Sequence, residues 1–524
     1  MNKISLEDLP RNHLNLISIT EVIWSCDFNQ IPHLITTLMT EIQNGDITIP
    51  AITAIVDVIS SKRMHQLRFF TEVLKQIFET FDFHLSPTYY FINKSLLEAL
   101  VTLKIIKNST IQLKSYRSIE DIYHIYPQNT INHCILWDNP DILQQFAQNT
   151  GFNINMRTSG GLSLIDLSAQ FGSTKCFNFL VLNNAKITVR TLENAFFGNS
   201  KEIIHKCLDQ FDLTQNCIEY AVRSHHNKTV KTLMSKYNFK YSWYSTLYSF
   251  NLKMFYPKLY SLENINSKDE NGETALIAAS RVGLVPIVRL LINKGANVSV
   301  PDSKLKTALS WSCEENLIEV AKLLIEAKSN LNSTDKYNWT PAHYAIIQNS
   351  HRILQMLVDK NAILSVHDRN GKTPLMVSSY NSAIECTKIL LTKHINLEEN
   401  DRNNWTALTI ASANNSLNIV RALVESGSDI EHEDKWGNTP IMIAAGKNNT
   451  ETVAYLASVG ANVNHQNMSG KTALIFAADN NSIESAKVLV DFNADVEIED
   501  INRDTVLSIA KRNGFKEIQA LISE

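Results

Sequence analysis

The sequence has no long hydrophobic run, little glycine and proline, and no strong excess of charge of either sign. No stretch of 18 apolar residues occurs, so we expect no transmembrane helix. Basic residues number 49 and acidic residues 53, which leaves a formal charge of −4 without the basic footprint of nucleic-acid-binding proteins. Residues 1–18 carry early charges and no apolar core, so we do not expect a secretory signal.

Cysteine is also scarce. The seven cysteines are scattered, odd in number and free of CxxC pairs. This usage indicates reduced thiols, and we expect the protein in the cytoplasm or the nucleus. With 44% hydrophobic and 19% charged residues among 524, the chain can nevertheless bury several cores.

One phrase recurs at a fixed interval. DRNGKTPLMVSS begins at residue 368, and DRNNWTALTIAS begins 33 residues later, at residue 401. The threonine of this phrase recurs at the same step without insertion: Thr274, Thr307, Thr340, Thr373, Thr406, Thr439, Thr472 and Thr505. A fixed period of this size predicts a stack of repeated structural units.

Each column of the repeat has a physical reason. Threonine can cap the first free N–H groups of a helix, and proline, which follows it in three units, is favoured at the first helical position. Ala or Ser always stands five residues after the threonine, which predicts a close helix contact. Gly, Asn or Ser stands nine residues after it; Gly and Asn tolerate the left-handed conformation that ends a helix.

A second apolar helix follows, such as IVRLLINKG at 287–295, and then a short β-like stretch with an aspartate-containing turn. Each unit is therefore expected to be a helix, a tight turn, a helix and a protruding hairpin. The hairpin glycine is replaced at Leu305, Asn338, Asn404 and Arg503, and we expect those four hairpins to be less regular.

These features resemble the ankyrin repeat, whose pattern residues 269–299 follow almost column by column. The resemblance implies an all-α fold: an ankyrin-repeat solenoid of eight units over residues 263–524. The last unit is rich in charged residues, and a polar outer face is what a C-terminal cap needs.

Degenerate ankyrin-like helix pairs are expected upstream, over residues 121–262. With Ser163 in the threonine column, Gly161 falls in the hairpin column and Gly172 in the turn column. Residues 193–210 and 218–235 look like further pairs, with trimmed hairpins between them.

Residues 1–120 show no repeat frame, but segments such as 31–45 and 65–81 have helical spacing of apolar residues. We therefore expect a compact α-helical N-terminal domain. SIEDIYHIYPQNTINHCILWDNPDILQQF (118–146) and ENAFFGNSKEIIHKCL (193–208) resemble a domain of unknown function that precedes ankyrin arrays in a large protozoan family.

Motifs that could carry chemistry have simpler structural explanations. The sequence GKT at 371–373 and at 470–472 lacks the earlier glycine of a phosphate-binding loop. A few residues could suggest a metal, but their spacings match no zinc pattern: His205, Cys207, Cys217, His225 and His226. No G-x-S-x-G elbow is present. We expect no enzyme activity, catalytic residue, cofactor or metal.

The residues at the hairpin tips differ from unit to unit, and these differences bear on partner binding. In ankyrin proteins the residues four, three and one before the threonine point outward, and partners often touch them. Aromatic and basic side chains occupy most positions of these columns in four successive units, and asparagine occupies the others. The aromatic and basic residues are Lys336, Tyr337, Trp339, Arg369, Lys372, Arg402, Trp405, Lys435 and Trp436. Such side chains are typical of interface hot spots, so we expect partner binding here. Trp339 and Trp405 could instead pack on adjacent hairpins and stiffen the array, whereas Tyr337 and Trp436 are expected to contact the partner.

The resemblance thus implies a non-enzymatic scaffold or adaptor, expected to be monomeric, that binds another protein through its concave face and hairpin tips. One alternative is that the N-terminal helical domain carries or recruits an effector activity; another is that the array is a spacer or self-association module. The partner surface could also be acidic, although solvation of exposed loops equally explains these carboxylates: Glu398, Glu399, Asp401, Asp429, Glu431, Glu433, Asp434, Glu497, Glu499 and Asp500.

Overall fold

The computed structural model describes residues 31–43, 67–80, 130–148, 151–158, 161–393 and 395–523, together with residues 20, 23, 52 and 56. These residues form helices and loops without a strand, apart from an isolated bridge between Arg157 and Ser163. The expected all-α fold is confirmed, whereas the β-like stretch of the hairpins forms no strand. None of the described helices has the length and hydrophobicity that crossing a membrane would take.

The chain divides into two compact units, Met1–Ala278 and Ala279–Glu524. In the described part of the first unit, α2 (Ile31–Gln43) and α4 (Leu67–Thr80) pack against each other. Both helices were expected from the spacing of their apolar residues. Most of the rest of the expected N-terminal helical domain, within residues 1–120, lies outside the described residues.

Five helix pairs follow in the first unit, and the first helices of successive pairs pack on one another. The pairs are α7 (Ile131–Leu136) with α8 (Pro140–Ala147), α9 (Leu164–Phe171) with α10 (Thr174–Leu182), α11 (Val189–Gly198) with α12 (Lys201–Leu208), α13 (Gln215–Arg223) with α14 (Asn227–Tyr237), and α15 (Trp243–Tyr248) with α16 (Leu252–Tyr260).

The columns assigned to the unit of Ser163 are confirmed. Ser163 caps α9 in a reciprocal capping box with Asp166. Gly161 and Gly172 both have positive φ angles, 76° and 70°, as the hairpin and turn columns require.

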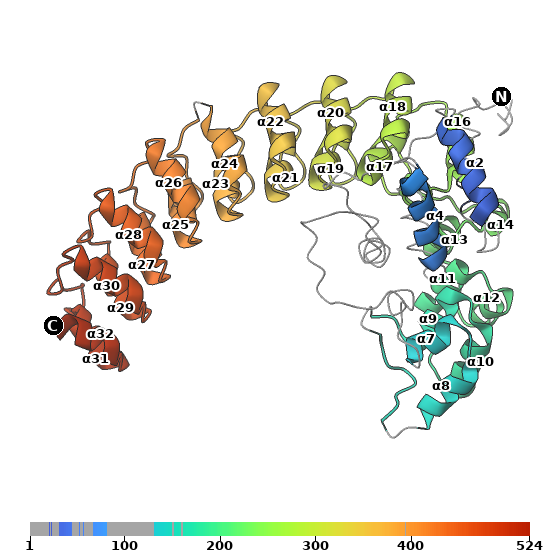
Figure 1. Cartoon of the computed structure of the whole chain (residues 1–524), viewed down its shortest axis with the longest axis horizontal. Coiled ribbons are helices and arrows are strands. Elements are labelled where there is room, and N and C mark those ends of the chain that lie inside the picture. The colour runs from blue at the N-terminus through green and yellow to red at the C-terminus, as the bar shows by residue number, and fades with distance from the viewer. Residues whose placement is uncertain are drawn as a thin grey trace. The chain divides into compact units, whose positions relative to one another are not determined.

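Eight further pairs follow one another along residues 275–523 (Figure 1), with the boundary between the two units inside the first helix. They are α17 (Ala275–Val282) with α18 (Val285–Asn293), α19 (Ala308–Glu314) with α20 (Ile318–Glu326), α21 (Pro341–Ile347) with α22 (His351–Asp359), α23 (Pro374–Tyr380) with α24 (Ile384–Leu391), α25 (Ala407–Ala413) with α26 (Leu417–Glu425), α27 (Pro440–Gly446) with α28 (Thr450–Ser458), α29 (Ala473–Asp479) with α30 (Ile483–Asp491), and α31 (Val506–Asn513) with α32 (Lys516–Ser523).

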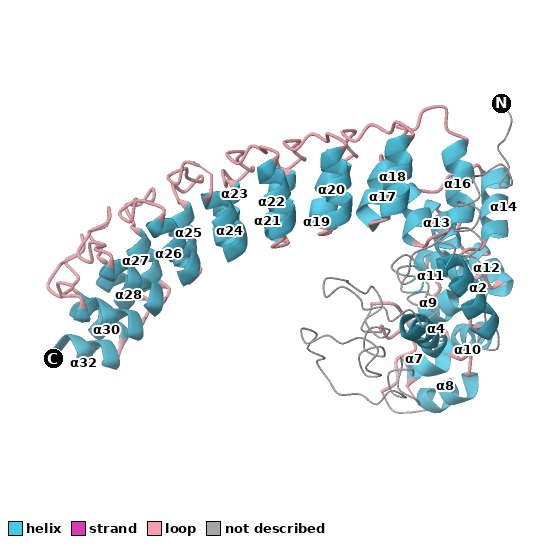
Figure 2. Cartoon of the chain, turned by 45° about the horizontal axis from the view of Figure 1, so that its top comes forward, coloured by secondary structure: helices cyan, strands magenta, loops and turns pink. Residues whose placement is uncertain are grey.

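Within this array the first helices from α19 onward pack on one another, and so do the second helices from α18 onward. Each of these units therefore hides its apolar faces against its neighbours. The small column lies at the contact between first helices; Ala345, Ser378 and Ala411, for example, are fully buried. The residue nine after each threonine has a φ angle between 51° and 85°, as predicted for a left-handed helix end. Long loops follow one another along one edge of the array (Figure 2).

These long loops are the hairpins, and one set of hydrogen bonds closes all of them. In the hairpin of Asp335, one carboxylate oxygen accepts the N–H groups of Tyr337 and Trp339, each at 2.8 Å. The N–H of Asn338 reaches the Asp335 carbonyl at 3.0 Å. The same bonds recur in eight hairpins, whose first residues are Asp269, Asp302, Asp335, Asp368, Asp401, Asp434, Asn467 and Asp500.

The expectation that four hairpins are less regular is wrong. Leu305, Asn338, Asn404 and Arg503 have φ angles of 62° to 65°, in the same left-handed region as Gly371 at 83°. Each closes the same turn as its glycine counterpart, because the bonds to the first residue of the hairpin impose that backbone conformation. A residue with a Cβ atom therefore adopts it at a cost in strain.

This strain can be tested at Leu305, whose side chain is half exposed and therefore contributes little to the hydrophobic core. We expect Leu305→Gly to raise the free energy of unfolding by about 0.5–1 kcal/mol, because glycine relieves the left-handed strain. Urea titration of the full chain measures it. Asn404→Gly is the matched control and should give no such gain, since its Nδ2 donates to the Glu433 carbonyl at 2.7 Å. Equal gains at both sites would contradict the strain argument.

His343 is the one histidine at the third position of a first helix in the array. Its Nδ1 accepts the N–H of Thr340 at 3.2 Å and closes a capping box. Burial lowers the pKa of His343 to about 4, although Asp335 and Asp368 nearby favour the charged form. A proton on Nδ1 would also displace the cap bond, so the folded array holds this imidazole neutral.

The depressed pKa predicts a loss of stability in mild acid. Between pH 6.5 and 4 the unfolded chain binds a proton at this position that the folded chain does not. Stability is therefore complete above pH 6.5 and declines as the pH falls. We expect a loss of about 1–2 kcal/mol from pH 7 to pH 5, measured by urea unfolding. His343→Thr, which copies Thr409 of a sister unit, should flatten this dependence; an unchanged pH slope in that variant would refute the assignment.

Candidate functional site

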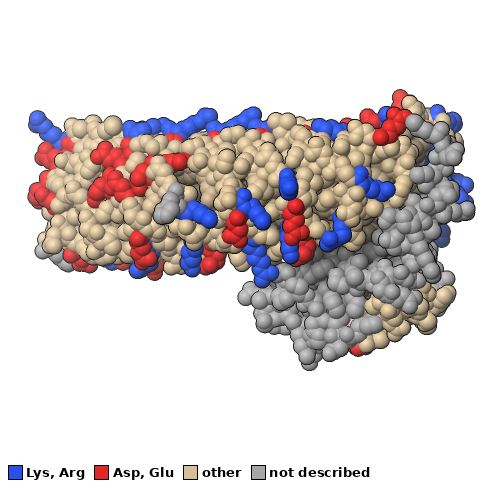
Figure 3. Space-filling model, turned by 90° about the horizontal axis from the view of Figure 1, so that it is seen from above, with Lys and Arg blue, Asp and Glu red and all other residues tan. Residues whose placement is uncertain are grey.

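The tips of successive hairpins are joined by backbone hydrogen bonds. The N–H of Arg369 donates to the Tyr337 carbonyl at 3.1 Å, and that of Lys435 to the Asn403 carbonyl at 3.2 Å. Six bonds of this kind connect the seven hairpins from Lys304 to Ile501. The expected site residues, which are spread over 101 positions of sequence from 336 to 436, therefore lie along one edge. Figure 3 shows a row of basic side chains along an edge of the array.

Trp339 and Trp405 connect neighbouring hairpins. The Nε1–H of Trp339 donates to Oδ2 of Asp368 at 3.3 Å, and that of Trp405 to Oδ2 of Asp434 at 3.2 Å. Each tryptophan thus satisfies the second carboxylate oxygen of the next hairpin, whose first oxygen already accepts backbone N–H groups. This arrangement favours the interpretation that these two rings stiffen the array.

Tyr337 and Trp436 are exposed instead, with 48% and 49% of their surfaces accessible. The Lys336 ammonium lies 4.8 Å from the ring centre of Tyr337, and the Lys435 ammonium lies 4.4 Å from that of Trp436. Cations over aromatic rings restrain both groups without hiding them. The two rings stand on rigid hairpins and are open to solvent.

A cavity of about 380 Å³ lies between two of these hairpins and the first helices behind them. Lys372, Tyr380, Arg402 and Trp405 line it, together with Asp401 and the buried Ile410. The Lys372 ammonium is 4.1 Å from the ring centre of Tyr380. Three of the expected site residues, Lys372, Arg402 and Trp405, therefore meet in one cavity.

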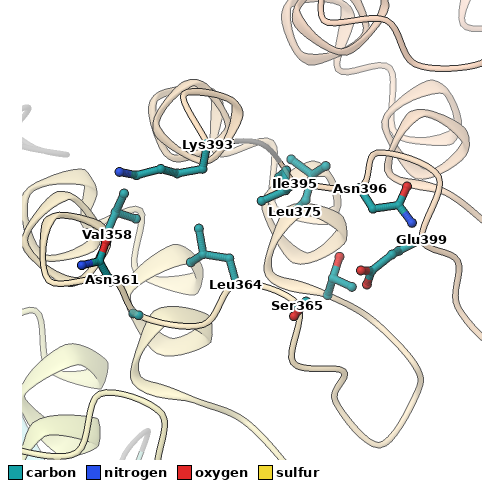
Figure 4. A pocket seen from close by; sticks show the side chains of 11 residues that line it. Val358, Asn361, Leu364, Ser365, Leu375, Lys393, Ile395, Asn396 and Glu399 are labelled. Atoms are coloured by element: carbon teal, nitrogen blue, oxygen red, sulfur yellow. The ribbon is translucent and has the colours of Figure 1, made fainter.

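A second cavity, of about 320 Å³, lies among α22, α23 and the loop after α24 (Figure 4). Leu364, Leu375 and Ile395 stand between Lys393 at one end and Glu399 at the other. It arises from a local irregularity. Ile395 occupies a column that holds only Ala or Ser in the other units, and its N–H bonds to Lys393 instead of to the residue five positions earlier.

Two families match parts of the chain, and their matches overlap at residues 250–258. The family described as "Ankyrin repeats (3 copies)" matches residues 250–335, 302–368, 327–401, 363–434 and 426–500. The family described as "Domain of unknown function (DUF3447)" matches residues 182–258. The chain contains ankyrin repeats and a DUF3447 domain.

The DUF3447 match includes the segment 193–208 but not the segment 118–146. Among solved structures, the chain is similar to the crystal structure of the human ASB11 ankyrin repeat domain. The identity is 19%, the match covers 42% of this chain and 97% of that chain, and the TM-score is 0.39. No curated protein matches. Ankyrin repeats imply a role in protein–protein interaction.

Three exposed apolar tips of the ankyrin array escaped the sequence analysis. Leu305, Met468 and Ile501 are 51%, 72% and 71% exposed. Met468 and Ile501 stand four residues before their threonines, in the column that also holds Arg369 and Arg402. The sequence of that column in the last two units already indicates Met468 and Ile501 as apolar tip residues. We call Leu305, Tyr337, Trp436, Met468 and Ile501 the tip row.

Acidic side chains gather over the end of the array toward its C terminus (Figure 3). Several of them have structural partners. Glu398 accepts the N–H of Asp429 in the next unit at 2.9 Å, and Glu431 accepts that of Asn462 at 2.7 Å. Two hairpin aspartates of this group, Asp434 and Asp500, are buried in their turns, whereas Asp401 is partly exposed. These contacts favour a structural role for much of the acidic group.

The ionisable groups considered for chemistry are held by the backbone. His225 and His226 each place Nε2 against a carbonyl oxygen, at 2.8 and 3.0 Å. Burial raises the pKa of Cys207 to about 12, far from that of a reactive thiol. Among the described residues, no group of three or more His, Cys, Asp and Glu side chains is placed to hold a metal ion.

The different roles of Trp405 and Trp436 can be tested by measuring the free energy of unfolding. We expect Trp405→Phe to lower the free energy of unfolding of the full chain by about 0.5–1.5 kcal/mol, because the donor to Asp434 is lost. Trp436→Phe is the matched control and should change it by less than about 0.5 kcal/mol. Urea unfolding measures both, and equal losses would argue against the link between hairpins.

Proposed function

We propose that the protein is a non-enzymatic scaffold or adaptor that binds a partner protein through the concave face and hairpin tips of its ankyrin array. In this proposal it acts as a monomer in the cytoplasm or nucleus. The observation that carries it is the tip row. Large apolar side chains stand exposed on a backbone whose hydrogen bonds are already made within and between the hairpins.

The physical argument is the low cost of binding. Burying a half-exposed Tyr or Trp ring removes a large apolar area from water, and such rings dominate interface energies. The hairpins are held by their closing bonds and by the bonds between tips, so little conformational entropy remains to be lost when a partner docks. The cations beside Tyr337 and Trp436 add charge complementarity and selectivity.

The partner-binding residues expected from the sequence divide into two roles within this proposal. Tyr337, Trp436 and the basic residues Lys336, Arg369 and Lys435 form the exposed edge. Trp339 and Trp405 hold the hairpins in register. The alternative, in which residues 1–120 carry or recruit an effector, falls largely on residues outside those the structure describes.

Affinity purification from the native cell tests the proposal. We expect the double variant Tyr337→Ala/Trp436→Ala to retain its fold and to lose captured partners by about 10-fold or more. Phe492→Ala, which removes an exposed aromatic ring after α30 and away from the tips, is the matched control. Recovery of the same partners in the same amounts by the double variant would reject this surface.

A further inference from the structure

The cavity lined by Lys372, Tyr380, Arg402 and Trp405 lies in units that differ from the other repeats in their charged residues. A basic residue one position before the threonine recurs in the array. In two other units it forms an ion pair with the residue eight positions later. Lys306 Nζ lies 2.5 Å from Glu314, and Lys471 Nζ lies 2.5 Å from Asp479.

The unit of Lys372 lacks this carboxylate, because the residue eight positions later is Tyr380. The Lys372 ammonium lies over the ring of Tyr380, which is 58% exposed. Across the cavity, Arg402 is exposed on the next hairpin. Within the described part of the chain, neither cation forms an ion pair.

The carboxylate in the cavity also lacks a donor that four sister hairpins have. It shares this feature with Asp500, whose equivalent positions hold Ile509 and Lys471. In four sister hairpins an aromatic N–H or O–H donates to the second oxygen of the aspartate, from Trp311, Tyr344, Trp339 or Trp405. At Asp401 the two positions that could supply this donor hold Ile410 and Lys372. Among the described residues, Oδ2 of Asp401 has no such donor, whereas Oδ1 accepts two backbone N–H groups.

From these departures we propose that the cavity is the anchor point for an acidic side chain on an extended segment of the partner protein. The proposal rests on the proposed function and names the chemistry of its partner. Lys372 and Arg402 bind the carboxylate, Tyr380 and Trp405 cover the chain beside it, and Asp401 accepts a backbone N–H group. The volume of about 380 Å³ lies within the range of pockets that hold small ligand groups.

A protein segment fits the cavity better than a nucleic acid. The lining carries two cations, Lys372 and Arg402, against one carboxylate, Asp401, which gives a net charge of +1. A peptide offers both an anion for the two cations and N–H groups for Asp401. The aromatic walls suit the apolar part of such a segment.

Selection from a random dodecapeptide library on the immobilised full chain tests this inference. We expect the selected peptides to be enriched in Asp and Glu relative to the input. Labelled copies should bind more weakly as salt rises. Lys372→Gln/Arg402→Gln should weaken their binding by about 10-fold or more. Tyr380→Glu should have the same effect, because it supplies the carboxylate that the sister units place there. Lys322→Gln/Arg352→Gln, which removes two exposed basic residues on the second helices α20 and α22, is the matched control and should bind as the wild type does.

Three results would overturn the inference: no peptide selected, selected peptides without acidic enrichment, or binding unaffected by the cavity variants. Competition by a labelled single-stranded oligonucleotide for the same cavity would also overturn it, in favour of a nucleic acid. Urea midpoints equal to the wild type confirm that each variant is folded. The capture experiment with Tyr337→Ala/Trp436→Ala is independent of these outcomes, so this inference can fail while the proposed function stands.

Discussion

The carboxylate that begins seven of the eight hairpins is the group on which the edge of the array depends. In the remaining hairpin the amide oxygen of Asn467 accepts the same two N–H groups. One oxygen of each carboxylate accepts two backbone N–H groups of its own turn, as at Asp368 with Asn370 and Lys372. Charge-assisted bonds of this kind are stronger than neutral ones. They fix the backbone of the turn, and the turn then places its N–H and carbonyl groups where the neighbouring tips bond to them. A continuous edge follows from a local interaction repeated every 33 residues.

The second oxygen of the same aspartates decides which aromatic residues are fixed between neighbouring hairpins. Where it accepts the indole N–H of the preceding hairpin, as Asp434 does from Trp405, the ring becomes part of the scaffold. Where the donor comes from the helix that follows, as Tyr344 supplies it to Asp335, the preceding tip is released from this role. Aromatic residues in neighbouring columns thus acquire different roles, because only some of them donate a hydrogen bond to a buried carboxylate oxygen.

Much of the array could be predicted from the sequence because its determinants are local. Threonine caps, small residues at the helix contact and left-handed helix ends each act within one unit, and the fixed period places them in register. The regular hairpins at Leu305 and Arg503 were missed because a residue's own preference for φ is weaker than three hydrogen bonds that impose the turn. The role of Trp405 depends on an acceptor 29 residues away, which composition and spacing in one unit do not reveal. The cavities were missed because each arises from a column that departs from the pattern.

Such departures are where a repeat array acquires specificity. A unit that follows the pattern satisfies its own charges: Lys471 neutralises Asp479, and the pair leaves nothing for a ligand. The unit of Lys372 keeps the cation and loses the acid, while its neighbour keeps Asp401 and loses the aromatic donor. Neither change disturbs the 33-residue period or the buried small column, so the stack retains its stability. Stability and recognition therefore reside in different columns of the same repeat, and the recognition columns can vary without altering how the units stack.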